Sequence, residues 1–259
     1  MRGRVLAIGG SDPSGGAGIQ ADLKTIAAFG AYGASAITAL TVQDTVAVTD
    51  AMALPAAFVG AQIAAVLGDI GADAVKTGML ADPGIVEAVC DALAAHPGLP
   101  LVVDPVLRAT AGRPLLAEAA LAVLKRRLLP MASLLTPNLP EAEVLCGMAI
   151  PDLAAMHHAA AALLTLGVPA VLVKGGHLPG DTVVDLLATE DGVEEFAAPR
   201  FATRHTHGTG CTLGSAIATA LAQGMSLRDA VLRARSYVRT AILAAPGLGR
   251  GNGPLNHGV

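Results

Sequence analysis

The sequence is poor in aromatic and charged residues. Its 259 residues include no Trp and only two Tyr, and charged residues make up 15% of the chain. The formal net charge is −4, with Lys and Arg scattered along the sequence. Proteins that bind nucleic acid usually present a basic stripe or aromatic side chains that stack on bases. Because both features are missing, we expect neither nucleic acid nor an anionic membrane among its partners.

Cysteine is also scarce, with three residues and no CxxC spacing. An odd number without paired spacing argues against a disulfide framework and against a zinc site. Cys90 and Cys146 lie in apolar surroundings and are expected to be small buried hydrophobic residues. Cys211 differs, because glycines surround it.

Two uncharged runs, 25–43 and 205–227, are long enough to raise the question of membrane spans. Both consist mainly of Ala, Gly, Thr and Ser and are interrupted by glycines, which favours buried α/β elements. At the N-terminus, Asp12-Pro13 brings charge and a turn before a signal-peptide core could form. We therefore predict a cytoplasmic protein.

Short apolar runs alternate with longer segments of helical spacing. Residues 4–10 predict a buried strand, 21–30 a helix and 33–43 a second strand, and the pattern continues through most of the chain. Strands separated by helices predict a mainly parallel sheet with helices on both faces, in one domain covering residues 1–259.

Two later segments carry more specific predictions. Residues 113–130 predict a helix with Pro114 at its start. Residues 182–201 depart from the alternation and predict a hairpin that turns at Glu190-Asp191-Gly192, at an edge of the sheet. The final stretch, 247–259, is interpreted as an irregular tail.

Polar clusters follow the predicted strands, where ligands bind in open parallel sheets. Neither GxxxxGK[ST] nor GxGxxG occurs, so the common nucleotide loops are not indicated. The clusters are "GGSDPSGGAG", Gln43-Asp44-Thr45, "KTGML", Asp104-Pro105, "TPNLPEAE", "VKGGH" and "THGTGC".

The last cluster leads into an alanine-rich segment of helical spacing, so Cys211 is expected to open a helix. Gly208 and Gly210 allow a tight turn there, and the amides of a helix N-terminus bind anions. The same environment favours thiolate, so we expect the pKa of Cys211 to be lowered. This pattern suggests phosphate chemistry.

Taken together, "GGSDPSGGAGIQADLKT", "KTGML", "VDPV", "LTPNLPEAE", "VLVKGGHL", "THGTGCTL" and "GPLNH" resemble the hydroxymethylpyrimidine and phosphomethylpyrimidine kinases of thiamine biosynthesis. The resemblance runs from about Ile8 to His257. It implies a ribokinase-like three-layer sandwich and a kinase that uses ATP and Mg²⁺. It also implies a homodimer.

For catalysis, the resemblance implies that the turn Gly208-Thr209-Gly210-Cys211 holds the transferring phosphate on its amides. Cys211 occupies the position where most ribokinase-like enzymes have an aspartate base. We predict that it accepts the acceptor's proton or positions the hydroxyl; the alternative is a structural cysteine that opens the helix.

The resemblance places Mg²⁺ near Asp104, Asn138 and Glu141, which suits a cation that prefers oxygen ligands. For Glu141 the alternative is stabilisation of a helix start. Lys174 and Thr206 are expected near the nucleotide phosphates, although Lys174 could equally be a solvated residue at a strand end.

For the acceptor, the resemblance places Asp22 and Gln43 at the pyrimidine, with Met79 and Val106 beside the ring and Gly10 close to it. The Gln43 amide offers a donor and an acceptor, which match an aminopyrimidine edge. Asp22 could instead stabilise the first turn of a helix.

Two positions depart from the family pattern, Asp44 where an asparagine is expected and Arg108 after "VDPV". Both adjoin the expected acceptor pocket and leave the substrate range open. A pyridoxine or pyridoxal kinase of the same fold is therefore the nearest alternative. From other classes, Cys211 with His207 could form a thiol hydrolase or transferase, and a non-catalytic pyrimidine-binding module is a third possibility.

Overall fold

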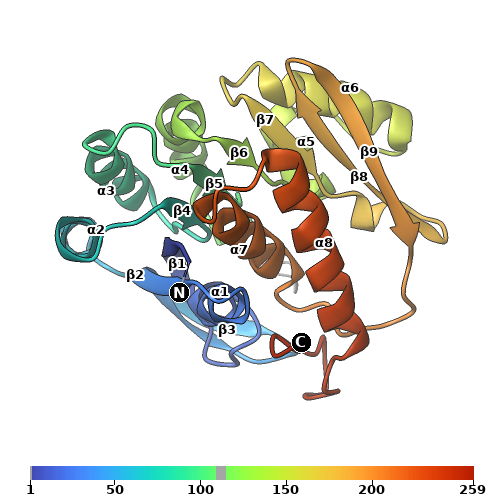
Figure 1. The fold of residues 1–259 in the computed structure, drawn as a ribbon, viewed down its shortest axis with the longest axis horizontal. Coiled ribbons are helices and arrows are strands. Elements are labelled where there is room, and N and C mark those ends of the chain that lie inside the picture. The colour runs from blue at the N-terminus through green and yellow to red at the C-terminus, as the bar shows by residue number, and fades with distance from the viewer. Residues whose placement is uncertain (1, 109–114) are drawn as a thin grey trace.

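In the computed structural model, residues 2–108 and 115–259 are described, and within them nine strands join one sheet (Figure 1). The strands are β1 (Arg4–Ser11), β2 (Tyr32–Gln43), β3 (Val48–Ala53), β4 (Ala74–Thr77), β5 (Leu101–Val103), β6 (Leu134–Leu135), β7 (Ala170–Val173), β8 (Thr182–Thr189) and β9 (Gly192–Pro199). Their order across the sheet is β3-β2-β1-β4-β5-β6-β7-β8-β9. Neighbours from β2 to β7 pair in parallel, whereas β3, β8 and β9 are antiparallel to their neighbours.

Helices cover both faces of this sheet. They are α1 (Gly18–Ala28), α2 (Ala56–Asp69), α3 (Pro83–Ala94), α4 (Glu118–Val123), α5 (Leu139–Cys146), α6 (Leu153–Leu164), α7 (Thr209–Ala222) and α8 (Leu227–Leu243). Helices α1, α7 and α8 share one buried cluster with the strands, and the other helices share a second cluster. The predicted three-layer α/β architecture is confirmed.

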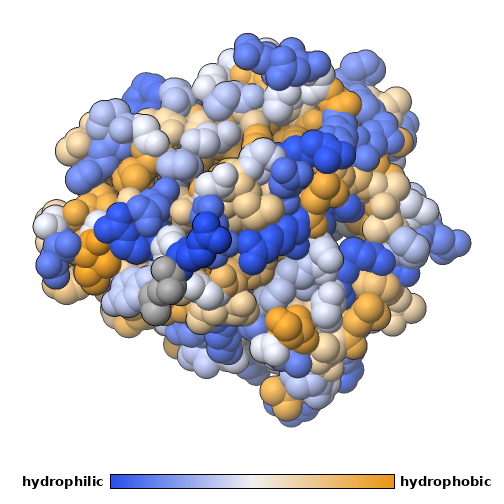
Figure 2. All heavy atoms as spheres, viewed as in Figure 1, coloured by the Kyte–Doolittle hydropathy of each residue, from blue (hydrophilic) through white to orange (hydrophobic). Residues whose placement is uncertain are grey.

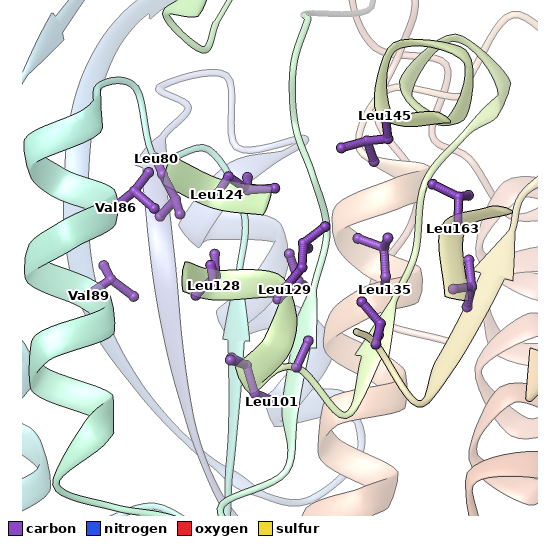
Figure 3. Close-up of a cluster of buried hydrophobic side chains, with 14 of the residues drawn as sticks. Leu80, Val86, Val89, Leu101, Leu124, Leu128, Leu129, Leu135, Leu145 and Leu163 are labelled. Carbon is purple, nitrogen blue, oxygen red and sulfur yellow. The ribbon is translucent and has the colours of Figure 1, made fainter. Parts of the chain in front are cut away.

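The central strands, β1 and β4 to β7, are largely apolar because both of their faces are buried. In β1, Leu6 and Ile8 belong to the cluster on the α2–α6 face, whereas Val5 and Ala7 belong to the cluster with α1, α7 and α8. Figure 3 shows part of the first cluster, in which Val86 of α3 and Leu80 lie beside Leu124. Full burial of one such side chain stabilises the fold by roughly 1.5–3 kcal/mol.

The hairpin predicted over 182–201 is confirmed as β8 and β9, with β9 at the sheet edge. The helix predicted over 113–130 is wrong at its start. It begins at Glu118, while Leu116 forms an isolated parallel bridge with Ala81; Pro114 lies outside the described residues. Beyond α4 the helix first widens into a π-helix over Leu124–Leu128 and then tightens into a 3₁₀ turn over Leu129–Met131.

Strand β3 was not predicted from the sequence. It pairs with β2 and most of its side chains are partly or fully exposed, so it lacks the apolar pattern of a buried strand. No helix within 2–108 and 115–259 is long and apolar enough to span a membrane. On the face shown in Figure 2, hydrophilic and hydrophobic residues are interspersed.

Candidate active site

A cavity of about 660 Å³ opens at the carboxyl ends of the parallel strands. This is the edge where sequence analysis placed the polar clusters, because ligands bind there in open α/β sheets. Every residue predicted for the site lines this cavity: Gly10, Asp22, Gln43, Met79, Asp104, Val106, Asn138, Glu141, Lys174, Thr206, Gly208, Thr209, Gly210 and Cys211.

The anion turn, residues 208–211, opens α7 as expected. Gly208 is the residue before the helix and has φ +83°, a conformation that glycine adopts without strain. A Cβ at Gly208 would lie 1.8 Å from the carbonyl oxygen of Gly16, and one at Gly210 would lie 3.1 Å from Lys174 Nζ. The two glycines therefore let the glycine-rich loop and a lysine approach the helix N-terminus closely, where amides bind anions.

Lys174 lies between two carboxylates beside this turn. Its Nζ is 2.9 Å from Asp104 Oδ1 and 4.0 Å from Glu141 Oε2. Burial and the neighbouring Asp104 raise the pKa of Glu141 to about 7, although Lys174 opposes this shift. The pKa of Lys174 is also raised, because its two carboxylate partners outweigh the effect of burial. Lys174 is thus a charged, largely buried group rather than a solvated strand-end residue.

Asn138 and Glu141 stabilise the start of α5 by a capping box. Asn138 Oδ1 accepts a hydrogen bond from the Glu141 amide at 2.9 Å, and Glu141 Oε2 accepts one from the Asn138 amide at 2.8 Å. The helix-start alternative for Glu141 is therefore observed. The capping box uses only one carboxylate oxygen of Glu141, Oε2, and does not involve Oε1.

The carboxylates of this cavity are candidate ligands for a divalent cation. Within residues 2–108 and 115–259, no three His, Cys, Asp or Glu side chains form a preformed metal cluster. Mg²⁺ in kinase sites typically uses one or two carboxylates together with substrate phosphates and waters. Asp104 and Glu141 are two nearly buried carboxylates that line one cavity, so the residues present fit that pattern.

Cys211 lies in the first turn of α7, but its predicted pKa shift is wrong. Burial, together with the nearby carboxylates of Asp22 and Asp104, raises the pKa of Cys211 to about 11, against an opposing effect of Lys76 and of a hydrogen bond from the Gly18 amide. The helix N-terminus alone would favour thiolate. Desolvation outweighs it here, so the ligand-free protein holds a thiol at neutral pH.

Sequence analysis did not single out Lys76, which is fully buried in β4. Its Nζ donates to both carboxylate oxygens of Asp22, at 2.9 and 3.0 Å, and Ser215 Oγ donates to Asp22 at 2.7 Å. Asp22 lies beyond the first turn of α1, so it does not stabilise that helix start. A lysine at a strand end gives no sequence signal for such a pair.

The opposite end of the cavity carries the residues expected at the pyrimidine. Gln43 ends β2, and its amide lies 3.3 Å from Thr41 Oγ1 and 3.3 Å from His207 Nε2. A Cβ at Gly10 would lie 3.0 Å from the sulfur of Met79, so the glycine allows this close packing. Val106 completes the apolar wall.

His207 makes local hydrogen bonds beside the anion turn. Its Nε2 lies 2.8 Å from Asp12 Oδ2 and 3.3 Å from Gln43 Nε2. His207 is therefore paired with a carboxylate and an amide rather than with the cysteine. This arrangement does not support a Cys-His hydrolase.

The two departures from the family pattern have different outcomes. Asp44 Oδ1 accepts from the amides of Val46 and Ala47, at 2.8 and 2.9 Å, and closes the turn between β2 and β3. These hydrogen bonds lower the pKa of Asp44. Arg108 does line the cavity, next to Val106. Only Arg108 thus bears directly on the pocket.

The cavity continues past the anion turn to residues that sequence analysis missed. Phe201 lines it, and the guanidinium of Arg239 lies 4.3 Å from the centre of the Phe201 ring. His177 lines it as well, and burial together with the positive charges of Lys174 and Arg200 lowers the pKa of that ring. The residues that line this part of the cavity do not form a short sequence motif, which is why sequence analysis missed them.

Comparison with known proteins agrees with this arrangement. The phosphomethylpyrimidine kinase family matches residues 12–256. The chain is 50% identical over 256 residues to the hydroxymethylpyrimidine/phosphomethylpyrimidine kinase of Streptomyces coelicolor, covering 98% of this chain and 94% of that protein. It is also 50% identical over 256 residues to the thiamine biosynthesis bifunctional protein ThiED of Geobacter sulfurreducens, covering 99% of this chain but only 52% of that protein.

Solved structures share the fold. Phosphomethylpyrimidine kinase from Clostridium difficile has a TM-score of 0.82 at 40% identity, over 92% of this chain and 99% of that one. The ADP complex of Bacillus subtilis pyridoxal kinase has a TM-score of 0.93 at 33% identity, over 99% of this chain and 98% of that one. The structure of Staphylococcus aureus pyridoxal kinase with AMP-PCP and pyridoxal has a TM-score of 0.91 at 33% identity, and the match covers 100% of this chain and 94% of that one. With its family match over residues 12–256 and its relatives at 50% identity, this chain belongs to the phosphomethylpyrimidine kinase family.

Proposed function

We propose that the protein uses ATP to phosphorylate 4-amino-5-hydroxymethyl-2-methylpyrimidine and then its monophosphate, giving the diphosphate used for thiamine. One observation carries this proposal: a single cavity holds an anion turn, a lysine between two carboxylates, and a glutamine in an apolar pocket. These groups suit a nucleotide phosphate at one end and an aminopyrimidine at the other. Cys211 lines the same cavity.

At the donor end, the anion turn is proposed to hold the transferring phosphoryl group on the amides of Gly210 and Cys211, since a helix N-terminus favours anions. The Thr209 amide instead donates to the Thr206 carbonyl at 3.2 Å and closes the turn. Lys174 adds a positive charge beside the anion turn, and Thr206 adds a hydroxyl. Positioning and charge neutralisation are the main needs of phosphoryl transfer. The relatives that bind ADP or AMP-PCP support the use of ATP.

Asp104 and Glu141 are proposed to hold Mg²⁺ directly or through waters, with Asn138 keeping Glu141 in place through the capping box. When bound, Mg²⁺ neutralises charge on the phosphates. Lys174 already occupies the space between the two carboxylates, so it also limits their repulsion.

At the acceptor end, Gln43 is proposed to pair with the amino group and a ring nitrogen of the pyrimidine, while Gly10, Met79 and Val106 enclose the ring. Asp22 is proposed to support the pyrimidine pocket from below, where its ion pair with Lys76 holds it in place.

In the transfer itself, the acceptor oxygen bonds to the γ-phosphorus of ATP, the bond to the bridging oxygen breaks, and ADP leaves. Cys211 is proposed to position the acceptor hydroxyl and to take its proton in the thiolate form. A raised pKa makes that form a minority in the ligand-free protein. Because proton removal comes late in a loose transition state, a minority thiolate is compatible with turnover.

Pyridoxal kinase activity is the second candidate, because pyridoxal kinases share the fold at TM-scores of 0.91 and 0.93. Their identity to this chain, 33%, is lower than the 50% found for a pyrimidine kinase. Membership of a kinase family favours catalysis over a pyrimidine-binding module. The homodimer implied by the resemblance remains a prediction, as do the single domain and the cytoplasmic location predicted from the sequence.

A coupled ADP-release assay tests the proposal with three acceptors: the hydroxymethylpyrimidine, its monophosphate and pyridoxal. We expect ADP release with both pyrimidines, and a higher kcat/KM for the hydroxymethylpyrimidine than for pyridoxal. Turnover of pyridoxal alone would replace the proposal by the second candidate. Absence of ADP release with all three would overturn both.

A further inference from the structure

The C-terminal segment Gly249–His257, here named the C-terminal strap, follows α8 and contains no helix or regular strand. Sequence analysis treated this region as an irregular tail. In Figure 1 the red end of the chain lies beside the blue β2–β3 region, although 206 residues separate Thr45 from Gly251 in the sequence. Its contacts show that the strap is irregular but firmly placed.

The strap pairs with the turn that follows Gln43. The Gly251 amide donates to Thr45 Oγ1 at 3.2 Å, and the Asn252 amide donates to the Thr45 carbonyl at 2.8 Å. Thr45 comes only two residues after Gln43, in the turn that joins β2 to β3. These bonds fix the backbone that carries the proposed pyrimidine-binding amide.

A second set of contacts reaches the anion turn. The His207 amide donates to the Gly253 carbonyl at 3.2 Å, and His207 forms an isolated parallel bridge with Pro254. The ring of His207 in turn contacts Gln43. The strap thus holds both supports of the Gln43 amide, the turn behind it and the histidine beside it.

The alternate glycines of the strap explain how it can lie so close. A Cβ at Gly251 would lie 2.1 Å from the Thr45 carbonyl oxygen, and one at Gly253 would lie 2.2 Å from His205 Nδ1. Real Cβ atoms do not approach other atoms to such distances, so a side chain here would force the strap away from the turn.

The end of the strap is anchored on the two helices behind the site. His257 Nε2 lies 2.9 Å from Thr212 Oγ1, and both side chains are buried. Tyr237 donates its hydroxyl to the His257 carbonyl at 2.8 Å. Thr212 directly follows Cys211 in α7, so the anchor lies next to the anion turn.

We propose that the C-terminal strap is a positioning element that holds the Gln43 turn at a fixed separation from the anion turn and Cys211. The proposal rests on the proposed kinase function. In-line transfer requires the acceptor oxygen close to the phosphorus, and a displacement of about 1 Å can cost on the order of 10²-fold in rate. The strap is the one segment within residues 2–108 and 115–259 seen here to bond to both the Gln43 turn and His207.

The first test compares Gly251→Ala with Gly247→Ala. Gly247 precedes the strap, has φ +71° and has nothing within 4 Å of its Cβ position, so alanine there brings backbone strain without a collision. We expect Gly251→Ala to raise the KM of the acceptor and lower kcat, each about tenfold. The KM of ATP should stay within about twofold, because the side chain added at Gly251 collides with Thr45, at the acceptor end of the cavity. Gly247→Ala should behave like the unchanged protein.

The second test uses smaller changes that keep the fold. Thr45→Ala removes the hydroxyl that accepts from the Gly251 amide, whereas Thr45→Ser keeps it. We expect a rise of several-fold in acceptor KM for the alanine variant and a return to the original value for the serine variant. A general loss of stability would not be restored selectively in this way.

Equal acceptor KM and kcat in Gly251→Ala and Gly247→Ala, or a parallel rise in both KM values, would overturn the strap's role. Failure of the proposed function looks different, since the unchanged protein would then release no ADP with either pyrimidine. If pyridoxal alone is turned over, the same variants are compared with pyridoxal as acceptor.

Discussion

Lys76 and Asp22 form an ion pair that is sealed from solvent beneath the first turns of α7. Lys76 Nζ lies 2.9 and 3.0 Å from the two oxygens of Asp22, and both side chains are 0% exposed. Ser215 of α7 donates to the same carboxylate at 2.7 Å. The pair therefore ties β4, α1 and α7 together directly behind Cys211.

Removing the cation should destabilise the fold. Lys76→Met leaves the Asp22 carboxylate buried without its partner, and we expect the free energy of unfolding to fall by about 3–5 kcal/mol. Urea unfolding followed by circular dichroism measures this change. The double variant Lys76→Met with Asp22→Asn removes both charges and should recover part of the loss. If the single variant unfolds at the same urea concentration as the unchanged protein, the pair contributes no stability.

Cys211→Ala should separate binding from turnover. Because proposed proton transfer and hydroxyl positioning depend on the sulfur, we expect kcat to fall by about 10²–10⁴-fold. The pyrimidine should still bind, since Gln43, Met79 and Val106 are unchanged, and calorimetry measures that affinity. Unchanged kcat would remove Cys211 from the proposed chemistry.

The raised pKa of Cys211 has its own test in the ligand-free protein. With a pKa of about 11, alkylation of Cys211 by iodoacetamide should be slow at pH 7 and rise about tenfold per pH unit between pH 8 and 10, because only the thiolate reacts. Mass spectrometry follows the modified peptide, and Cys211→Ala gives the background from Cys90 and Cys146. A rate that levels off below pH 8 would instead support the lowered pKa that the helix start suggested.

Two glycines with the same backbone conformation allow the anion turn to be tested. Gly208 has φ +83° and its Cβ would lie 1.8 Å from the Gly16 carbonyl oxygen, whereas Gly224 has φ +84° and nothing within 4 Å. Alanine at either position adds about 1–2 kcal/mol of left-handed strain. Both variants should therefore be less stable. Only Gly208→Ala should also lose turnover, by about 10²-fold. Thermal unfolding and ADP release measure the two effects, and similar turnover in both variants would contradict the role of the turn.

Much of the fold follows from local patterns. Strands buried on both faces appear as short apolar runs, and the helices between them carry caps, such as Asp152, that the structure retains. Strand β3 was not predicted, because an exposed edge strand needs no alternation of apolar and polar residues. The helix predicted from Pro114 begins only at Glu118, since α4 starts after Leu116 pairs with Ala81.

In the site, too, some residues could be predicted from local sequence patterns and others could not. The rim residues could be predicted because strand ends and motifs mark them in the sequence. Lys76 opens the motif KTGML, but its pairing could not be predicted, because its partner Asp22 is 54 residues away and only the folded chain brings them together. The pKa of Cys211 depends on burial and on Asp104, which a helix-start argument does not contain. The contacts of His257 likewise arise only from tertiary packing.

Glu141 should make the stability of the metal-free protein depend on pH. Its pKa is raised to about 7 in the folded chain from 4.5, mainly by burial. Between these two values the folded state holds the proton more tightly than the unfolded state, so the contribution of Glu141 to stability falls as pH rises from 4.5 to 7 and is constant above that. The full change is on the order of 3 kcal/mol.

Glu141→Gln isolates this contribution, because glutamine cannot ionise but can still accept the hydrogen bond from the Asn138 amide that closes the capping box. In urea unfolding with EDTA, the two proteins should have similar stability near pH 4.5. Above pH 7 the variant should be the more stable protein, because it carries no buried carboxylate beside Asp104. Other carboxylates titrate equally in both proteins and cancel in the difference. A difference that does not change with pH would show that folding leaves the pKa of Glu141 unshifted, because Lys174 offsets the effect of burial.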